Sequence, residues 1–536
     1  MSSTTNLRSR RSAAQLHALA GVEREIRAQD THSRRKYLRE FNRAFRTYDA
    51  VLDSQQVQTA IHSADVVLVG DYHALPAAQR YAATLLEQRA LAGDRPVVLG
   101  VETVFARDQH VLDEWWRREI DETELRQRIR FDLDWGYDWA PFYELLVSAR
   151  DHAEALYGLD CMPREDLRKI GARDRHAAVK IAEIRERHPH AVIFALFGES
   201  HLAPGHLPRA LHKALPEAKI CTVLQNIDAL YWHAAGERCD KIEAVRVKDG
   251  VLCVFNATPL EKYENYRLFL DQWSRIDEGP DFAPTIYNLI ESLTRFLEIN
   301  RYAPHNGTQP RFLVDLLPEV HGRSSDAMLR RLLMRKGVSE EECASMLALV
   351  EERGSAYLPQ VNAFYVREFQ MVHAAEDVAR FLHQACQGLP QRLGSYLAEV
   401  EGNGNGAGQR RSAIDHFYAR VIEHSVAYFG SRVLYPSRPA VPEEASQLSR
   451  AACEKVAQAA VRADNARFDS AAQELGYRIG SQIYNAYLAG KVAPGGVRRL
   501  FLVHLDQPGH ARKVCAAVIA KLRSAARKAQ ASTSST

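Results

Sequence analysis

Short apolar runs alternate with amphipathic stretches over residues 50–275. The runs are rich in Val, Ile, Leu and Phe, which is typical of buried parallel strands, and the stretches between them have helical spacing. The pattern predicts an α/β fold, a mostly parallel sheet flanked by helices. The expected strands are 64–70, 96–101, 154–160, 191–197 and 218–224, and the expected helices include Leu75–Leu91, Asp108–Arg128 and Asp174–His188.

A hairpin is predicted at the end of this region. The segment 241–256 alternates between apolar and polar residues on both sides of Asp249-Gly250. Asp-Gly between two alternating runs is a strong hairpin signal. We expect this hairpin to close one edge of the sheet.

Beyond about residue 280 the strand pattern ends and helical spacing continues. Examples are Tyr287–Leu297, Ser325–Arg335, Glu340–Arg353 and Asn362–Gln387. Glu401–Gly408 is rich in Gly and Asn, as flexible linkers are. We therefore expect a basic helical arm over 1–50, the α/β domain over 51–278 and an all-helical C-terminal half. This half would comprise helical domains over 279–400 and 411–527, a linker over 401–410 and a disordered tail over 528–536.

A short motif occurs twice, each time at the end of a predicted strand. Gly70-Asp71-Tyr72-His73 ends one strand and Gly198-Glu199-Ser200-His201 ends another, while a third run stops at Glu102. The carboxyl ends of parallel strands face the crevice where ligands bind. We therefore expect His73, Glu102 and His201 to converge in one pocket.

These residue types allow two kinds of chemistry. Two neutral imidazoles and the carboxylate of Glu102 could hold a divalent transition metal that keeps positions open for water. Asp71 or Glu199 could then orient the histidines, or act as a general base. Alternatively, His73 and His201 are structural residues whose nitrogens bond to backbone carbonyls. Asp160, at the end of the strand 154–160, is a further candidate lining residue, although a helix cap is the favoured interpretation.

Two other groups of residues have both a functional and a structural interpretation. The aromatic group could form the wall of a flat apolar ligand such as a porphyrin, or pack a helix onto the sheet; it comprises Trp115, Trp116, Trp135, Tyr137 and Trp139. The second group lies in the helical half, where a solvated helix face is favoured over a metal site; it comprises Glu368, His373, Glu376 and Asp377, with His416, Glu423 and His424 as a loose second motif. Gly476 and Gly480 predict close helix packing.

Composition limits the kinds of partner and the cellular compartment that we expect for this protein. The 536 residues carry a formal net charge of +3, with 46% hydrophobic and 26% charged residues, so composition gives no argument for nucleic-acid binding. No stretch has the apolar length of a membrane span, and the basic N-terminus lacks the apolar segment of an export signal. The 8 cysteines are scattered without a CxxC motif, which suits a reducing compartment. We expect a cytoplasmic protein with no nucleic-acid partner and no membrane span.

The α/β region resembles the haem-binding ChaN family, which is similar to the Tiki metalloproteases and erythromycin esterases of a wider superfamily. The resemblance covers roughly residues 50–275 and does not extend to the helical half. It is based on the order of several motifs, namely Val66–His73, Val97–Glu102 with Arg107-Asp108-Gln109, Asp134–Trp139 with Phe142-Tyr143, Leu156–Asp160 and Ala195–His201.

The resemblance implies that His73, His201 and Glu102 form a metal or catalytic centre. Asp71 matches the acidic residue that esterase relatives use beside the histidine, although it is one methylene shorter than the usual glutamate. Haem in the ChaN family is linked to a tyrosine at a dimer interface, which implies a haem or other small-molecule ligand and a possible homodimer. No motif places that tyrosine in this chain.

Two classes of function are therefore expected. The first is a haem- or metal-binding protein whose helical half is a partner or regulatory module, and the alternative is a metal-dependent hydrolase that acts on an amide or ester. A scaffold that has lost its site is a third class, against which the intact set of strand-end residues argues. The candidate catalytic residues are Asp71, His73, Glu102 and His201, and the candidate cofactor-binding residues are Glu199 and Asp160.

Overall fold

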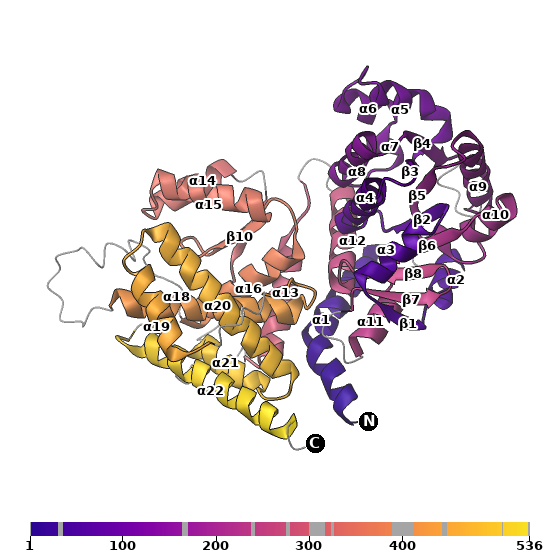
Figure 1. Cartoon of the computed structure of the whole chain (residues 1–536). Coiled ribbons are helices and arrows are strands. Elements are labelled where there is room, and N and C mark those ends of the chain that lie inside the picture. Colours follow the sequence, from indigo (N-terminus) through magenta and orange to yellow (C-terminus); the bar gives the residue numbers. More distant parts are fainter. Residues whose placement is uncertain are drawn as a thin grey trace. The chain divides into compact units, whose positions relative to one another are not determined.

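The chain forms two compact units, Arg24–Leu270, and Met1–Glu23 together with Asp271–Thr536. We refer to them as the α/β unit and the helical unit (Figure 1). The computed structural model describes residues 2–29, 36–162, 170–236, 242–274, 279–299, 317–322, 326–387, 412–441, 448–505 and 507–533. Among these residues, no helix combines the length and the apolar character needed to cross a membrane.

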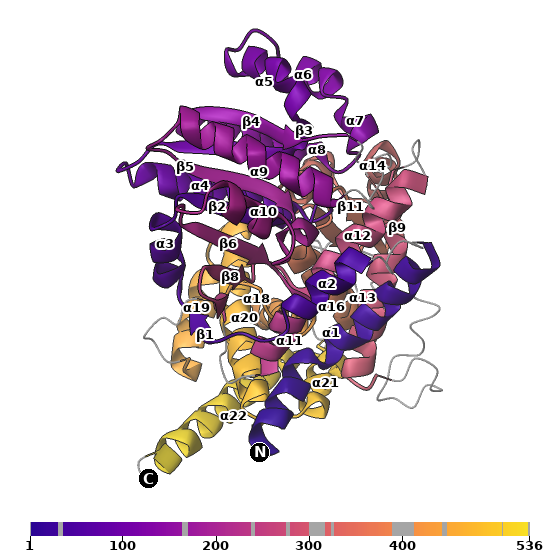
Figure 2. The ribbon, with the colours of Figure 1, turned by 90° about the vertical axis from the view of Figure 1, so that its right-hand side faces the viewer.

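The α/β unit is built on an eight-stranded sheet with the order β1-β7-β8-β6-β2-β5-β3-β4 (Figure 2). Strands β8, β6, β2, β5, β3 and β4 pair in parallel, whereas β7 pairs antiparallel with both β1 and β8. The strands are β1 Ala50–Leu52, β2 Val66–Asp71, β3 Val97–Phe105, β4 Ala155–Asp160, β5 Val192–Gly198, β6 Ile220–Gln225, β7 Ala244–Lys248 and β8 Val251–Val254.

The mostly parallel sheet predicted from the sequence is confirmed. The five expected strands and the hairpin at Asp249-Gly250 are present, and the short strand β1, which was not expected, lies outside the hairpin. Strand β3 is longer than expected and continues through Glu102 to Phe105, with an irregular register against β4 after Val101. Glu102 therefore lies within a strand rather than after one.

Helices cover both faces of the sheet, because the strands are apolar on both sides (Figure 1). In β2, Val67 and Val69 face a core shared with α3, α4, α5 and α8, and Val66 and Leu68 face a core shared with α2, α9, α10 and α11. The helices are α2 Lys36–Ala44, α3 Ser54–His62, α4 Pro76–Leu91, α5 Gln109–Trp116, α6 Glu122–Arg128, α7 Phe131–Asp134, α8 Trp139–His152, α9 Ile170–Arg187, α10 Leu207–Ala214, α11 Asp228–Gly236 and α12 Pro259–Ser274, with 3₁₀ turns η2 Ala106–Asp108 and η4 Glu199–Leu202.

The helical unit is mostly helical, as expected, but it also contains a small sheet. Its order is β10-β11-β9, where β9 is Glu319–His321, β10 Ser355–Leu358 and β11 Ala363–Val366. The expectation of an uninterrupted helix over Asn362–Gln387 is therefore wrong. Phe364, Tyr365 and Val366 are fully buried in β11, because aromatic and β-branched residues pack well on a pleated surface.

The helices of this unit are α1 Ser2–Gln29, α13 Ala283–Phe296, α14 Asp326–Arg335, α15 Glu340–Arg353, α16 Met371–Gln387, α18 Ala413–Leu434, α19 Arg450–Ala460, α20 Asn465–Leu488, α21 Pro494–Leu502 and α22 His510–Thr533. Helix α1 belongs to the helical unit up to Glu23. His17 Nδ1 lies 2.9 Å from Ser292 Oγ, and the Asn288 side chain donates to the Ala18 carbonyl at 2.9 Å. The linker expected over 401–410 lies outside the described residues, and α22 extends into the tail expected over 528–536.

Charged residues of α16 and α18 that were expected on a solvated face are buried. Glu376 and Asp377 are 0% exposed, and Glu423 and His424 are buried as well. The expectation failed because a prediction from hydrophobic patterns assigns charged residues to the solvent. The partners on other helices that allow such residues to be buried are not visible in the pattern. Gly476 and Gly480 pack closely, as predicted, since a Cβ at Gly480 would lie 2.5 Å from the Ser425 carbonyl of α18.

Arginines from several elements pair with these buried acids. Glu376 lies 2.9 Å from Arg438, 3.4 Å from Arg353 and 3.4 Å from Arg380, and it accepts from the Tyr477 hydroxyl at 2.6 Å. Burial raises the pKa of Glu376, but the three guanidinium groups lower it to about 2. These four charged side chains, with Asp377, Arg420 and Glu423, are called the charge cluster below.

Candidate functional site

The parallel strands bring the two histidines and the glutamate together. His73 follows β2, His201 lies in η4 directly after β5, and Glu102 lies in β3, while β5 pairs with both β2 and β3. His73 Nε2 is 3.9 Å from one carboxylate oxygen of Glu102, and His201 Nε2 is 3.5 Å from the other. We call Asp71, His73, Glu102, Arg173, Asp174 and His201 the polar centre.

An aspartate orients His73. Asp71 is 2% exposed, and its Oδ2 lies 2.7 Å from His73 Nδ1. The side chain of Gln79 donates a hydrogen bond to the other carboxylate oxygen of Asp71. A carboxylate at Nδ1 favours the proton on that nitrogen and leaves Nε2 to face Glu102. The shorter side chain of Asp71 therefore reaches the histidine two residues later.

A second aspartate orients His201, and it was not among the residues singled out in the sequence. Asp174, in α9, has one oxygen 2.6 Å from His201 Nδ1 and the other 2.9 Å from His206 Nδ1. Burial raises the pKa of Asp174, but the hydrogen bonds to His201 and His206 lower it below its usual value. Both histidines of the polar centre thus have an aspartate at Nδ1 and Glu102 opposite Nε2.

Glu102 is a buried carboxylate that is already well satisfied. It accepts from the backbone N–H of Gly198 at 2.5 Å and from Arg173 at 2.5 Å. Burial raises the pKa of Glu102, but His201, Arg173 and His73 lower it to about 2. Asp160 holds the guanidinium of Arg173 with contacts of 2.8 and 2.9 Å, so it acts on the site through Arg173.

Glu199 does not orient either histidine, contrary to one of the roles expected for it. Its oxygens lie 3.1 and 3.2 Å from Lys262 Nζ, which also lies 4.3 Å from the centre of the Tyr72 ring. Burial raises the pKa of Glu199, whereas Glu199 raises the pKa of Lys262 against the opposing effect of burial. The carboxylate at His201 Nδ1 belongs to Asp174.

Some residues of the aromatic group pack in the core, and others lie beside His73. Trp115 and Trp139 are 1% and 5% exposed and belong to the core between the sheet and its helices. Trp135 and Tyr137 lie beside His73, with ring centres at 4.4 and 5.2 Å from the imidazole, and Tyr137 stacks on Phe269 at 4.2 Å. The His73 side chain is 22% exposed, which makes it more accessible than Glu102 or His201.

The space inside the polar centre is small. A Cβ added at Gly198 would lie 3.0 Å from His73 Nε2 and 3.1 Å from Glu102 Oε2. The imidazole nitrogens lie 3.9 and 3.5 Å from Glu102, so a porphyrin does not fit between the imidazoles and Glu102. Within the described residues no three His, Cys, Asp or Glu side chains are arranged to hold a metal ion, so the metal set of His73, Glu102 and His201 stays a prediction.

The comparison with protein-family models agrees with the resemblance seen in the sequence. Residues 57–200 match the family described as haem-binding uptake, Tiki superfamily, ChaN, which confirms the resemblance over that segment. Among solved structures, "Cofacial heme binding to ChaN of Campylobacter jejuni" is 14% identical, with a TM-score of 0.27, and the match covers 33% of this chain and 86% of that chain. The search of curated proteins gave no match.

Proposed function

We propose that the α/β unit binds haem, and that the ligand lies against the accessible side of His73, beside Trp135 and Tyr137. The observation that carries the proposal is the position of these two rings on the one accessible imidazole of the polar centre. Aromatic rings bury a large area against a flat macrocycle. Because His73 Nε2 is turned towards Glu102, no residue is assigned as the iron ligand.

The family match supports haem as the ligand. The proposal also includes a cellular compartment and an assembly state. The cysteines within the described residues are all free, which supports a cytoplasmic setting. A homodimer is the assembly we propose, because the ChaN family places haem at a dimer interface.

Haem is expected to bind the purified protein saturably, with a shifted Soret band. The variant Tyr137→Leu should bind roughly tenfold more weakly, because one stacked ring is worth about 1 kcal/mol beyond its buried area. Trp116→Leu is the matched control, since Trp116 packs on the same core but is not in contact with His73 in the described structure. Equal affinities for the two variants, or no saturable Soret shift in the wild type, would count against the proposal.

A second candidate function is favoured by the geometry inside the polar centre. Two imidazoles, each held by an aspartate, direct Nε2 towards the same buried carboxylate. A water molecule that reaches one of these histidines could lose a proton to its Nε2 while the water oxygen attacks an ester or amide carbonyl. The imidazolium would return this proton to the leaving alcohol or amine as the C–O or C–N bond breaks, which leaves a carboxylic acid and the free histidine. The aspartates would stabilise the resulting imidazolium, and Arg173 keeps Glu102 ionised. This hydrolase differs from the metal-dependent one expected from the sequence, because the chain's own residues carry out the proton transfer.

Hydrolysis of p-nitrophenyl acetate tests this candidate. Asp174→Asn is expected to lower the rate about 10²-fold or more, because the amide removes the partner that fixes the tautomer of His201. Asp113→Asn is the control, since Asp113 lies on the exposed side of α5. Loss of activity on chelation would indicate the metal-dependent version. Unchanged turnover in Asp174→Asn would remove the hydrolase candidate.

A further inference from the structure

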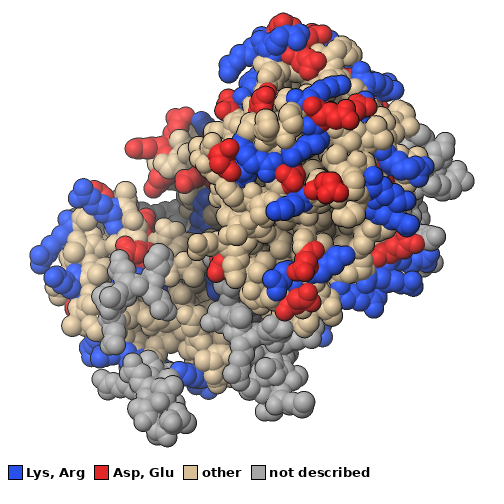
Figure 3. Space-filling view, turned by 45° about the vertical axis from the view of Figure 1, so that its right-hand side comes forward, with Lys and Arg blue, Asp and Glu red and all other residues tan. Residues whose placement is uncertain are grey.

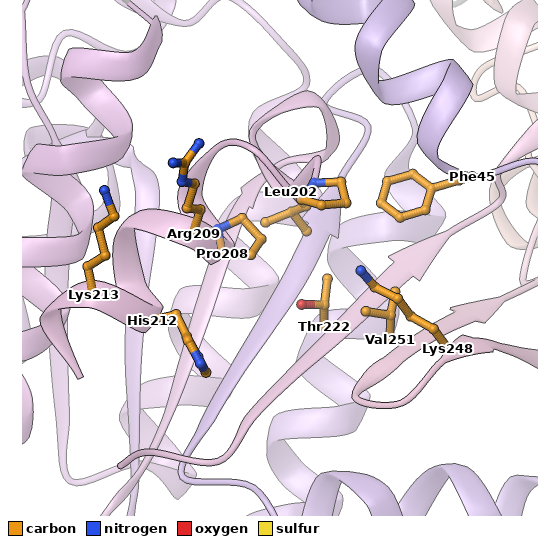
Figure 4. A pocket seen from close by; sticks show the side chains of 10 residues that line it. Phe45, Leu202, Pro208, Arg209, His212, Lys213, Thr222, Lys248 and Val251 are labelled. Atoms are coloured by element: carbon orange, nitrogen blue, oxygen red, sulfur yellow. The ribbon is translucent and has the colours of Figure 1, made fainter. Parts of the chain in front are cut away.

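The α/β unit has a pocket of about 420 Å³ whose lining residues differ from those of the polar centre (Figure 4). Its size is within the usual range of small-molecule sites, about 300–1,000 Å³. The apolar lining residues are Phe45, Leu202, Pro204, Pro208 and Val251, the basic ones are Arg209, His212, Lys213 and Lys248, and Thr222 is the remaining one. No residue of the lining is acidic.

Separate elements build the floor of the pocket. Phe45 follows α2, Leu202 ends η4 and Thr222 lies in β6, and these three side chains are 1%, 1% and 4% exposed. They are held by the core of the unit, so the floor is formed before any ligand arrives. Figure 4 shows Phe45, Val251 and Lys248 on one side, with Leu202 and Thr222 between them and α10.

The rim of the pocket carries positive charge from two opposite sides. Arg209, His212 and Lys213 come from α10, and Lys248 comes from the hairpin of β7 and β8. All four are exposed, and within the described part of the chain none of them pairs with an acidic side chain. Elsewhere on the surface in Figure 3 acidic and basic side chains are interspersed.

Helix stability explains only part of this charge. His212 and Lys213 lie in the last turn of α10, where cations interact favourably with the helix dipole. Lys248 belongs to another element, and Arg209 lies earlier in the helix. The charges on both sides of an apolar floor therefore call for an explanation other than helix capping.

We propose that this pocket binds a small amphiphilic anion, a molecule with an apolar body and a carboxylate at one end. The apolar body would lie on Pro204, Pro208 and Val251, the apolar lining residues that are exposed or half-buried, and the carboxylate would lie between Lys248 and Arg209. A purely polar anion would leave Pro204, Pro208 and Val251 in contact with water, and a neutral apolar molecule would leave the cations unpaired. The combination selects a ligand that has both parts, and it does not depend on the function proposed for the polar centre.

Calorimetric titration of the full-length protein with decanoate tests the proposal. Decanoate should bind saturably, and decanol, which has the same chain without the charge, should bind at least about tenfold more weakly. Lys248→Glu and Arg209→Glu should each weaken decanoate binding by roughly tenfold, because each reverses one charge at the rim. Added salt should weaken binding as well, since the charges are exposed.

Lys219→Glu is the matched control, because Lys219 is an exposed lysine of the same unit outside the pocket lining. It should bind decanoate like the wild type. All three substitutions are at exposed positions, and circular dichroism checks that each variant is folded. Absence of decanoate binding, equal binding of decanol, or an equal loss in Lys219→Glu and Lys248→Glu would overturn the proposal.

Discussion

Replacing Glu376 by glutamine is expected to destabilise the helical unit by about 3–5 kcal/mol, the usual effect of leaving a buried charge without its partner. Glu376 is 0% exposed and is the shared counterion of Arg353, Arg380 and Arg438. Glutamine has almost the same shape as glutamate, so the loss of stability measures the effect of the charge rather than of packing. Because the pKa of Glu376 is about 2, the side chain is ionised at neutral pH, and the substitution removes a negative charge.

Urea unfolding followed by far-ultraviolet circular dichroism measures this effect. Glu341→Gln is the control, because Glu341 is an exposed glutamate in the first turn of α15. Its substitution should cost no more than about 1 kcal/mol, the limit for a charge near a helix N-terminus. Similar midpoints for the two variants would mean that the buried ion pairs add nothing to the stability of this unit.

Lowering the pH from 7 to 5 is expected to destabilise the helical unit by roughly 3–4 kcal/mol, through His383 and His424. Burial lowers the pKa of His383 to about 4 and that of His424 to about 3. Neither ring makes a hydrogen bond through either nitrogen. An unfolded histidine has a pKa near 6.5, so the unfolded chain binds protons that the folded unit excludes. Stability is therefore complete above pH 6.5 and is lost as the pH falls towards 4.

His383→Leu separates this effect from general acid sensitivity. The variant should lose about half as much stability between pH 7 and pH 5 as the wild type, because only His424 then takes up a proton. Tryptophan fluorescence gives a separate reading of the α/β unit, where five of the six tryptophans lie (Trp115, Trp116, Trp135, Trp139 and Trp232). An unchanged pH dependence in His383→Leu would show that the buried histidine does not carry the effect.

The sequence was sufficient to predict the sheet and the convergence of three side chains. Parallel strands buried on both faces leave continuous apolar runs, and the carboxyl ends of such strands meet at one edge. His73, His201 and Glu102 followed from that rule alone. The exact place of Glu102 did not, because the irregular register that extends β3 to Phe105 leaves no mark in the hydrophobic pattern.

The partners of those side chains could not be predicted from the sequence. Arg173 and Asp174 are consecutive residues of a helix whose charged positions would ordinarily face water. The only signal was that both fall at the beginning of the helix between the strands that end at Asp160 and Gly198. Their burial depends on tertiary contacts with Glu102 and His201, which no local pattern records.

The same limit explains the charge cluster. Glu376 and Asp377 have the spacing of a solvated helix face. Arg353 and Arg438, which come from other segments, form ion pairs with Glu376 that stabilise its burial. Patterns of hydrophobicity predict which apolar residues are buried. They do not identify charged residues whose burial depends on partners distant in the sequence.

The most direct test of the polar centre as the functional site compares His73→Ala with His110→Ala. Haem binding by the Soret band and hydrolysis of p-nitrophenyl acetate are measured for both variants and for the wild type. His110 is an exposed residue of α5 that does not belong to the polar centre, so its substitution should leave both signals unchanged. We predict that His73→Ala loses whichever signal the wild type shows, by about tenfold or more. Equal retention in the two variants would mean that His73 is structural and that the ChaN resemblance describes the fold alone.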